Sequence, residues 1–411
     1  MGASKKKAGH YIDKKKKKNE RQVMSFEELP LDEYEKEEKK KRKIKLDKKK
    51  ILIAAAILVG LVLTVLVYFT RDVLFGCNRH KDAHNFSAAV SGTSVDSGNF
   101  REFAEGLCYA SDTNVVYLDS KGEEMFSHQH GFARPVLKTR GSNAIVYDLG
   151  ANRFSVYNEE GETFTTATEE KIFLADIDSQ GNYILVTKPK DFNAKLYAFN
   201  KENNTVYTYS FAEYQITSAA VSNDGKSAAV CGVSADNGSR ISALYVLSFD
   251  KTEPVAKHQI TDDLLYDCAF LASNSVCAIG QDGAYVSSGK NFGYIDHISY
   301  GGMSLSAYDM NSDVNSLVLS LSRSGDGRNC NIQYVDASGD TQKIIETSFG
   351  IASLSTYKDR IAFSDNSNIY LYKKNGDSVS SYSISSAKQV RLYTIDGVYI
   401  LGLNGITGVE L

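Results

Sequence analysis

Two histidines at alternating positions are the best metal-binding candidates in this sequence. In His128-Gln129-His130, a β-strand would place both imidazoles on one face, as two ligands of a transition metal require. No third ligand stands at a recognisable spacing. His80 and His84 have the spacing of one helical face, but they precede the strand-rich part of the chain. We therefore expect no bound metal and keep His128 and His130 as the candidate pair.

The sequence contains six cysteines, which offer a second kind of chemistry. Cys268 and Cys277 are the best candidates for a disulfide, because residues 271–274 would turn the chain and lay their two strands side by side. Buried free thiols, used as small core residues, are the alternative.

No catalytic constellation is recognisable. The sequence has neither a Gly-x-Ser-x-Gly nucleophile elbow nor a glycine-rich phosphate loop, and its carboxylates fall mainly in turns. Residues 309–313 (Asp-Met-Asn-Ser-Asp) superficially resemble a calcium loop but lack the following Gly and the terminal Glu, and their place in the repeat described below matches a hairpin turn. We expect no catalytic residue and no cofactor.

A run of twenty uncharged, mostly aliphatic residues, 51–70, has the length of a membrane-spanning helix. At roughly 1.5 Å per residue it covers roughly 30 Å, the thickness of the hydrocarbon core. The charged region before it is too long for a signal peptide, and no cleavage site follows closely. The sequence therefore predicts a largely disordered tail (1–50), a transmembrane helix (51–70), a juxtamembrane stalk (71–85) and an outer domain (86–411).

Charge on either side of this run predicts the topology. Residues 36–50 contain ten Lys and Arg, whereas residues 71–85 contain three, so the N-terminus is expected in the cytoplasm and residues 71–411 outside. Residues 1–50 carry a net charge of +9, which leaves −12 for the remainder of a chain with a net charge of −3. The Lys-rich tail is expected to contact anionic lipid head groups, and no nucleic-acid partner is expected.

An acidic and hydrophobic segment interrupts the basic tail. Ser25 and Glu28 match a capping box, so a short helix could fold there on a cytoplasmic partner. The residues of this predicted docking segment are Ser25, Phe26, Glu28, Leu29, Leu31 and Tyr34.

The outer part has the sequence pattern of an all-β domain built from repeats. Short alternating runs rich in Tyr, Val, Ile and Thr are separated by Gly, Asn and Asp, and the whole chain has only four prolines. A repeat of about 40 residues, the length of a four-stranded propeller blade, recurs over residues 131–384 as six complete units. The clearest unit has its strands at 351–356, 360–364, 368–372 and 378–384.

The two ends of the repeat region must complete the ring. One further unit spans residues 100–129, and three strands follow the last complete unit, at 389–395, 398–403 and 406–411. Residues 86–90 are expected to supply the fourth strand of the last blade, because an unclosed propeller would leave two unpaired edges. The sequence thus predicts an eight-bladed β-propeller, with seven blades as the alternative if the terminal fragments merge.

The single apolar span, the eight-fold repeat and turns such as Ser222-Asn223-Asp224-Gly225 resemble bacterial PQQ-like or YVTN-type β-propellers, and more narrowly an uncharacterised family of membrane-anchored bacterial propellers. The resemblance covers roughly residues 46–411 and implies a fold and a location but no catalytic residues. It has one departure: PQQ-type repeats commonly use Trp to lock neighbouring blades, and this chain has none, so a quinone cofactor is not expected and packing falls to 25 Tyr and 19 Phe. The expected core positions include Val146, Ile184, Leu185, Val246 and Ile361.

Three classes of function are consistent with the sequence. The first is a non-enzymatic scaffold that binds an unknown protein or polymer of the cell envelope. The second is a signalling or assembly subunit that links an outside ligand to a cytoplasmic partner through the tail. The third is a hydrolase or quinoprotein-like oxidoreductase that uses the central channel. We favour the first, because a propeller presents two broad loop faces and has no intrinsic chemistry.

Overall fold

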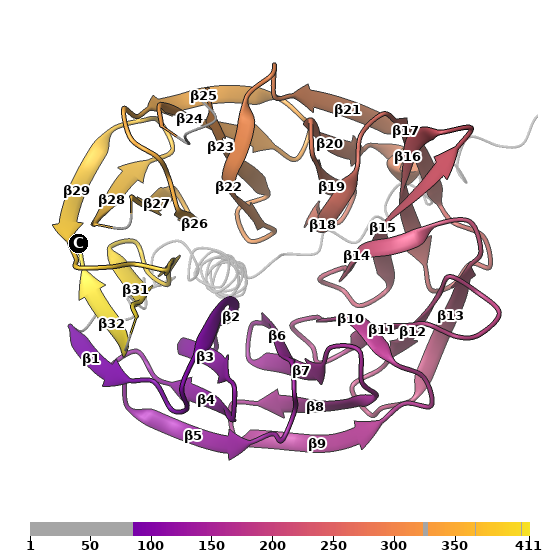
Figure 1. The fold of residues 1–411 in the computed structure, drawn as a ribbon, viewed down its shortest axis with the longest axis horizontal. Coiled ribbons are helices and arrows are strands. Elements are labelled where there is room, and N and C mark those ends of the chain that lie inside the picture. The colour runs from indigo at the N-terminus through magenta and orange to yellow at the C-terminus, as the bar shows by residue number, and fades with distance from the viewer. Residues whose placement is uncertain (1–84, 324–327, 366, 404) are drawn as a thin grey trace, which may run out of the picture. The chain divides into compact units, whose positions relative to one another are not determined.

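The computed structural model describes residues 85–323, 328–365, 367–403 and 405–411 (Figure 1). The chain divides into two compact units, 1–76 and 77–411, and every described residue belongs to the second. The predicted tail, its docking segment and the predicted transmembrane helix lie outside the described residues, as does nearly all of the predicted stalk. Among the residues that are described, no helix is both long and apolar enough to cross a membrane.

The described unit consists of eight four-stranded antiparallel sheets, the blades of a β-propeller, arranged around a central axis (Figure 1). Blade 1 contains β2 (Val95–Phe103), β3 (Gly106–Ser111), β4 (Asn114–Leu118) and β5 (Glu124–Gln129). Blade 2 contains β6 (Pro135–Arg140), β7 (Asn143–Asp148), β8 (Arg153–Asn158) and β9 (Gly161–Ala167). Blade 3 contains β10 (Ile172–Ile177), β11 (Tyr183–Thr187), β12 (Ala194–Phe199) and β13 (Thr205–Phe211). Blade 4 contains β14 (Gln215–Val221), β15 (Ser227–Asp236), β16 (Ser239–Ser248) and β17 (Ala256–Thr261).

The second half of the ring repeats the same order. Blade 5 contains β18 (Leu265–Ala272), β19 (Ser275–Gly280), β20 (Gly283–Ser288) and β21 (Tyr294–Ser299), with the 3-10 turn η1 (Lys290–Phe292) before its last strand. Blade 6 contains β22 (Ser304–Asn311), β23 (Ser316–Ser322), β24 (Cys330–Asp336) and β25 (Thr341–Glu346). Blade 7 contains β26 (Ser353–Tyr357), β27 (Arg360–Ser364), β28 (Asn368–Lys373) and β29 (Ser378–Ser383). Blade 8 contains β30 (Gln389–Leu392), β31 (Gly397–Leu401), β32 (Gly405–Glu410) and β1 (Phe86–Ala89).

The ring closes where the first described strand joins the last blade. β1 pairs antiparallel with β32, in a register that runs from Phe86 opposite Gly408 to Ala89 opposite Gly405. The outer strand of blade 8 therefore comes from the opposite end of the propeller sequence. This confirms the predicted eight-bladed ring and the role predicted for residues 86–90, and it excludes the seven-bladed alternative.

Apolar side chains fill the space between neighbouring blades. Eight hydrophobic clusters are present, and each one joins the facing sides of two successive blades. Tyrosine occupies much of the volume that tryptophan would take, since Tyr109, Tyr157, Tyr183, Tyr300 and Tyr399 are all nearly fully buried. The structure also confirms the expected core positions, because Val146, Ile184, Leu185, Val246 and Ile361 are all buried completely.

The hairpin turns follow the predicted chemistry. In the turn between β10 and β11, Asp178 Oδ1 accepts the backbone N–H groups of Gln180 and Asn182, each at 2.8 Å. Gly181 has φ +91°, a conformation that glycine adopts without steric cost. These residues stabilise the turn that separates an inner strand from its neighbour.

Polar side chains on the inner strands also tie each blade to the next. At five junctions a side-chain oxygen of one inner strand accepts a backbone N–H of the following inner strand. The accepting oxygens belong to short side chains, and the donor–acceptor distances are 2.8–3.2 Å. The bonded pairs are Asn99 with Leu137, Asp176 with Val221, Ser218 with Cys268, Asp309 with Thr356, Ser353 with Val390 and Ser355 with Leu392. We call these bonds inter-blade latches; they orient the inner strands that line the channel.

Candidate functional site in the central channel

The central channel contains a polar cavity of about 270 Å³. Its wall comes from the inner strands of seven blades: β2, β6, β10, β14, β18, β22 and β30. The charged side chains that line it are Arg101, Lys138, Arg140, Asp176, Asp267, Asp309 and Arg391. Segments that are far apart in sequence thus contribute charged groups to one cavity.

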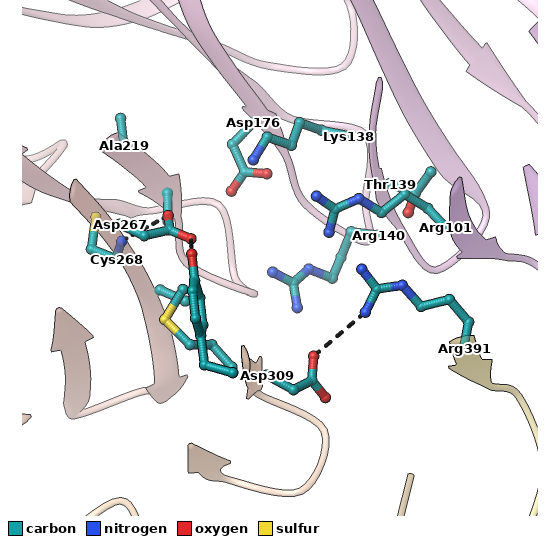
Figure 2. A pocket seen from close by; sticks show the side chains of 14 residues that line it. Arg101, Lys138, Thr139, Arg140, Asp176, Ala219, Asp267, Cys268, Asp309 and Arg391 are labelled. Carbon is teal, nitrogen blue, oxygen red and sulfur yellow. Dashed lines mark hydrogen bonds and ion pairs between the residues drawn. The ribbon is translucent and has the colours of Figure 1, made fainter. Parts of the chain in front are cut away.

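Three guanidinium groups point into this cavity from different blades, those of Arg101, Arg140 and Arg391 (Figure 2). Arg101 keeps part of its surface open to the channel, but the surrounding protein atoms still lower its pKa, and the nearby positive charge of Arg391 lowers it further. Like charges at close range are costly unless a counter-charge is present. The three arginines therefore concentrate positive charge in the cavity.

The carboxylates of the wall are largely engaged in holding the ring together. Asp267 accepts from Ser218 Oγ through Oδ1 and from the Tyr308 hydroxyl through Oδ2, both at 2.8 Å. Asp309 Oδ2 accepts from both the backbone N–H and the hydroxyl of Thr356, at 2.8 and 2.6 Å. Its other oxygen lies 3.7 Å from Arg391 Nη1. Asp267 in blade 5 thus connects blades 4 and 6, and Asp309 in blade 6 connects to blades 7 and 8. Both carboxylates therefore stabilise the ring.

A hydrogen-bonded chain crosses the channel where the inner strands end. Arg140 Nη1, at the end of β6 in blade 2, donates to Ser312 Oγ at 2.7 Å. Ser312 lies in the turn after β22, in blade 6 on the opposite side of the ring, and its Oγ also lies 3.4 Å from Asn223 Oδ1 in blade 4. This chain narrows the cavity at that end.

A shallower groove adjoins the other side of the cavity. It has a volume of about 350 Å³ and shares Tyr308 with the cavity, and its remaining lining residues include Tyr266, Leu305 and Leu354. Tyr266 is 42% exposed and contacts Tyr308 edge to face, with ring centres 6.4 Å apart. The channel mouth therefore combines an exposed aromatic ring with a charged interior.

The sequence did not single out these channel residues, and one interpretation was wrong. Asp309 was placed in a hairpin turn, whereas it lies within β22, and the turn begins only after Asn311. Charged residues recur within the inner strands, as at Arg101, Asp176 and Arg391. The repeated charge at the inner strands is the signal in the sequence that points to the channel.

The two candidate histidines have separate protein environments. His130 Nδ1 accepts the backbone N–H of Phe132 at 2.9 Å, so its Nε2 carries the proton and donates to the Ser111 carbonyl at 3.1 Å. Burial lowers the pKa of His130, which favours the neutral ring. His128 instead lies against the ring of Tyr157, at 6.1 Å between ring centres. Within the described ranges, no group of three or more His, Cys, Asp or Glu side chains is arranged to hold a metal, so the metal-binding pair stays a prediction without a third ligand.

The structure does not bring the two thiols of the candidate disulfide together, although the predicted strand pairing is present. β18 and β19 pair so that Cys268 faces Ala278 and Cys277 faces Ala269. The two cysteines are therefore one position out of register and point to opposite sides of the sheet, Cys268 toward blade 4 and Cys277 toward blade 6. Both are free and buried.

We expect the described cysteines to be unreactive in the folded protein. All five are buried, and burial raises the pKa of Cys108, Cys231 and Cys277, so little thiolate is available. In a Cys77→Ser variant, iodoacetamide should modify no cysteine under native conditions and five in urea, as counted by mass spectrometry. Only three modified thiols in urea, without reductant, would show that a disulfide forms after all.

The geometry defines the class of the protein: an eight-bladed β-propeller with four antiparallel strands in each blade. Residues 78–407 match the family of unknown function DUF5711, and the chain belongs to this family. No curated protein sequence matches the chain.

Solved structures with similar folds share little sequence with this chain. The computationally designed Ika8 protein has a TM-score of 0.54 and 11% identity, and the match covers 80% of this chain and 98% of Ika8. The C-terminal WD40 domain of Sif2 has a TM-score of 0.53 and 10% identity, covering 80% of this chain and 97% of that domain. BamB from Moraxella catarrhalis has a TM-score of 0.49 and 13% identity, and the match covers 79% of this chain and 100% of BamB. The first two likenesses support the propeller fold alone.

Proposed function

We propose that this protein is a non-enzymatic binding scaffold: a bacterial membrane-anchored propeller of the PQQ-like or YVTN type, held outside the cell, that binds an envelope protein or polymer. The apolar run 51–70 and the excess of Lys and Arg before it support the anchor and its orientation. In this proposal the basic tail lies against anionic lipid head groups on the cytoplasmic side.

The use of the channel carboxylates carries the proposal. General acid–base catalysis needs a carboxyl group that is free to exchange a proton with a substrate. Asp176, Asp267 and Asp309, the three carboxylates of the cavity wall, instead each accept a hydrogen bond from a neighbouring blade, so they hold a rigid frame. The exposed ring of Tyr266 stands beside the cavity at the channel mouth, where a partner can reach both. A rigid frame with an accessible mouth suits binding.

Cysteine labelling on intact cells tests the location. In a Cys77→Ser background, Lys201→Cys places a reactive thiol in an exposed turn of blade 3, and Lys15→Cys places one in the tail. We expect a membrane-impermeant maleimide to label Lys201→Cys in intact cells and Lys15→Cys only after permeabilisation. The reverse pattern would contradict the proposed topology.

Site-specific photo-crosslinking tests the binding face. A benzophenone amino acid in place of Tyr266 lies at the channel mouth, and the same substitution of Tyr294, which is 71% exposed on the outer strand β21, is the matched control. We expect a discrete crosslinked product in the native envelope from the first position and none from the second. Identical products from both positions, or none from either, would argue against binding at the channel mouth.

A further inference from the structure

The channel cavity holds more hydrogen-bond donors than the protein uses. Each guanidinium has five N–H groups. Arg101 donates through Nε to the Gly98 carbonyl at 2.9 Å, and Arg140 donates through Nη1 to Ser312. Arg391 donates through Nε to the Phe100 carbonyl at 3.3 Å. Most N–H groups of these three side chains thus have no acceptor within the part of the chain that the structure describes.

Lys138 adds a fourth positively charged group to the cavity. It lies on β6, two residues before Arg140, and lines the same cavity. Its ammonium has no hydrogen-bond or ion-pair partner among residues 85–323, 328–365, 367–403 and 405–411. Lys138 can therefore be changed without breaking a contact that holds the ring.

The acidic groups near these cations do not saturate them. Asp267 has both oxygens occupied by Ser218 and Tyr308, and Asp309 reaches Arg391 only at 3.7 Å, beyond hydrogen-bond distance. Asp176 accepts a backbone N–H through Oδ2 and has its second oxygen free among the described residues. Glu102, next to Arg101 on β2, faces solvent, yet the protein around the channel raises its pKa, which weakens it as a counter-charge.

The geometry points to a binding site for an oxyanion, a phosphate or carboxylate group, held by Arg101, Arg140 and Arg391 with Lys138 beside them. The planar fork of a guanidinium matches both kinds of group with paired hydrogen bonds. The volume of about 270 Å³ is small for a whole drug-like molecule. Pockets for such ligands measure roughly 300–1,000 Å³, so the cavity suits a small anion or one acidic group of a larger ligand.

This site would give the proposed scaffold its ligand chemistry, and it rests on that proposal only for the identity of the natural ligand. Entry is from the side of Tyr266, because the bond from Arg140 to Ser312 narrows the opposite end. A ligand could place its acidic group among the arginines while a neighbouring ring or chain lies on Tyr266. The channel thus combines an anion-binding site with an aromatic ring at its entrance.

Isothermal titration calorimetry on the full-length protein in detergent tests the site, with inorganic phosphate and citrate as separate probes at constant ionic strength. We expect saturable binding of at least one probe with a dissociation constant below about 1 mM, since several charge-assisted hydrogen bonds form together. Binding of phosphate alone would identify a phosphoryl ligand, and binding of citrate alone a carboxylate ligand. Binding of neither probe would overturn the inference.

Two variants and one control separate this cavity from the basic tail. Arg101→Gln and Lys138→Gln should each weaken binding about tenfold, the loss of one charge-assisted contact. Arg323→Gln removes the same charge from a side chain that is 62% exposed and does not line the cavity, and this variant should bind as the unmodified protein does. Equal binding by all three variants would mean an adventitious ion only.

The fold and the proposed function have independent readouts. Lys138→Gln should keep the melting temperature of the unmodified protein, because no contact within the described ring depends on it. If the protein binds neither anion but is labelled from outside as proposed and crosslinks at Tyr266, the oxyanion site is overturned and the proposed scaffold function is retained. If the protein binds an anion but Lys201→Cys is not labelled in intact cells, the oxyanion site is retained and the proposed location outside the cell is overturned.

Discussion

Replacing β1 (Phe86–Ala89) with glycine and serine should lower the free energy of unfolding by about 5 kcal/mol and the melting temperature by about 10 °C or more. The substitution removes the outer strand of blade 8 and leaves β32 as an open edge. It also removes Phe86 and Ala88 from the apolar cluster between blades 8 and 1. Circular dichroism during heating measures the shift.

A point variant keeps this prediction testable if the strand replacement aggregates. Phe86 packs against Tyr399, with 5.9 Å between ring centres, and a Cβ at either Gly122 or Gly408 would clash with its ring. Phe86→Ala should cost about 2 kcal/mol, less than a fully buried phenylalanine because the ring is half-buried.

A glycine–serine replacement of the loop at residues 188–191 is the matched control for β1. This loop lies between β11 and β12, is largely exposed and contributes to no strand. We expect it to cost less than about 1 kcal/mol. Equal losses for the loop and for β1 would mean that closure of the ring contributes little to stability.

Asp309→Ala should destabilise the propeller by about 3 kcal/mol, because it leaves polar groups of two blades without their acceptor. One carboxylate serves the backbone N–H and the hydroxyl of Thr356 in blade 7 and faces Arg391 in blade 8. Asp309 is only 16% exposed, so water replaces these contacts poorly. The expected fall in melting temperature is about 5–10 °C.

Two further variants isolate the cause of this effect. Asp309→Asn keeps one acceptor oxygen and loses the charge, so it should cost roughly half as much as the alanine substitution. Asp313→Ala removes an exposed carboxylate from the turn that follows the same strand and should change stability by less than about 0.5 kcal/mol. If Asp309→Ala matched Asp313→Ala, the inter-blade latches would be energetically unimportant.

Local patterns predicted most of the architecture. The alternation of apolar and polar residues, with turns such as Asp178 to Gly181 between them, sets the strands because both signals act over a few residues. The repeat then predicted the blades, and the need to pair every edge predicted that β1 would complete blade 8. The choice between seven and eight blades depended on the pairing of β1 with β32, which is a long-range contact.

The sequence did not predict the register of β18 against β19, which places Cys268 and Cys277. The turn at residues 271–274 correctly placed β18 beside β19, but a shift of one residue decides which face a side chain occupies. Irregularities in the pairing of these strands, on both sides of Cys268, set the final register. The pair that looked suited to a disulfide therefore lies on opposite faces.

The sequence alone determined the class of fold and the core positions, because both depend on periodicity and turn chemistry along the chain, while the long-range pairing of β1 with β32 decided between seven and eight blades. Only the tertiary structure decided which charged side chains meet in the channel. Arg391 bonds to the carbonyl of Phe100 across 291 positions of sequence, and Arg140 bonds to Ser312 across 172. Such contacts exist because a closed ring brings the inner strand of every blade to one axis, a geometry that no local pattern encodes.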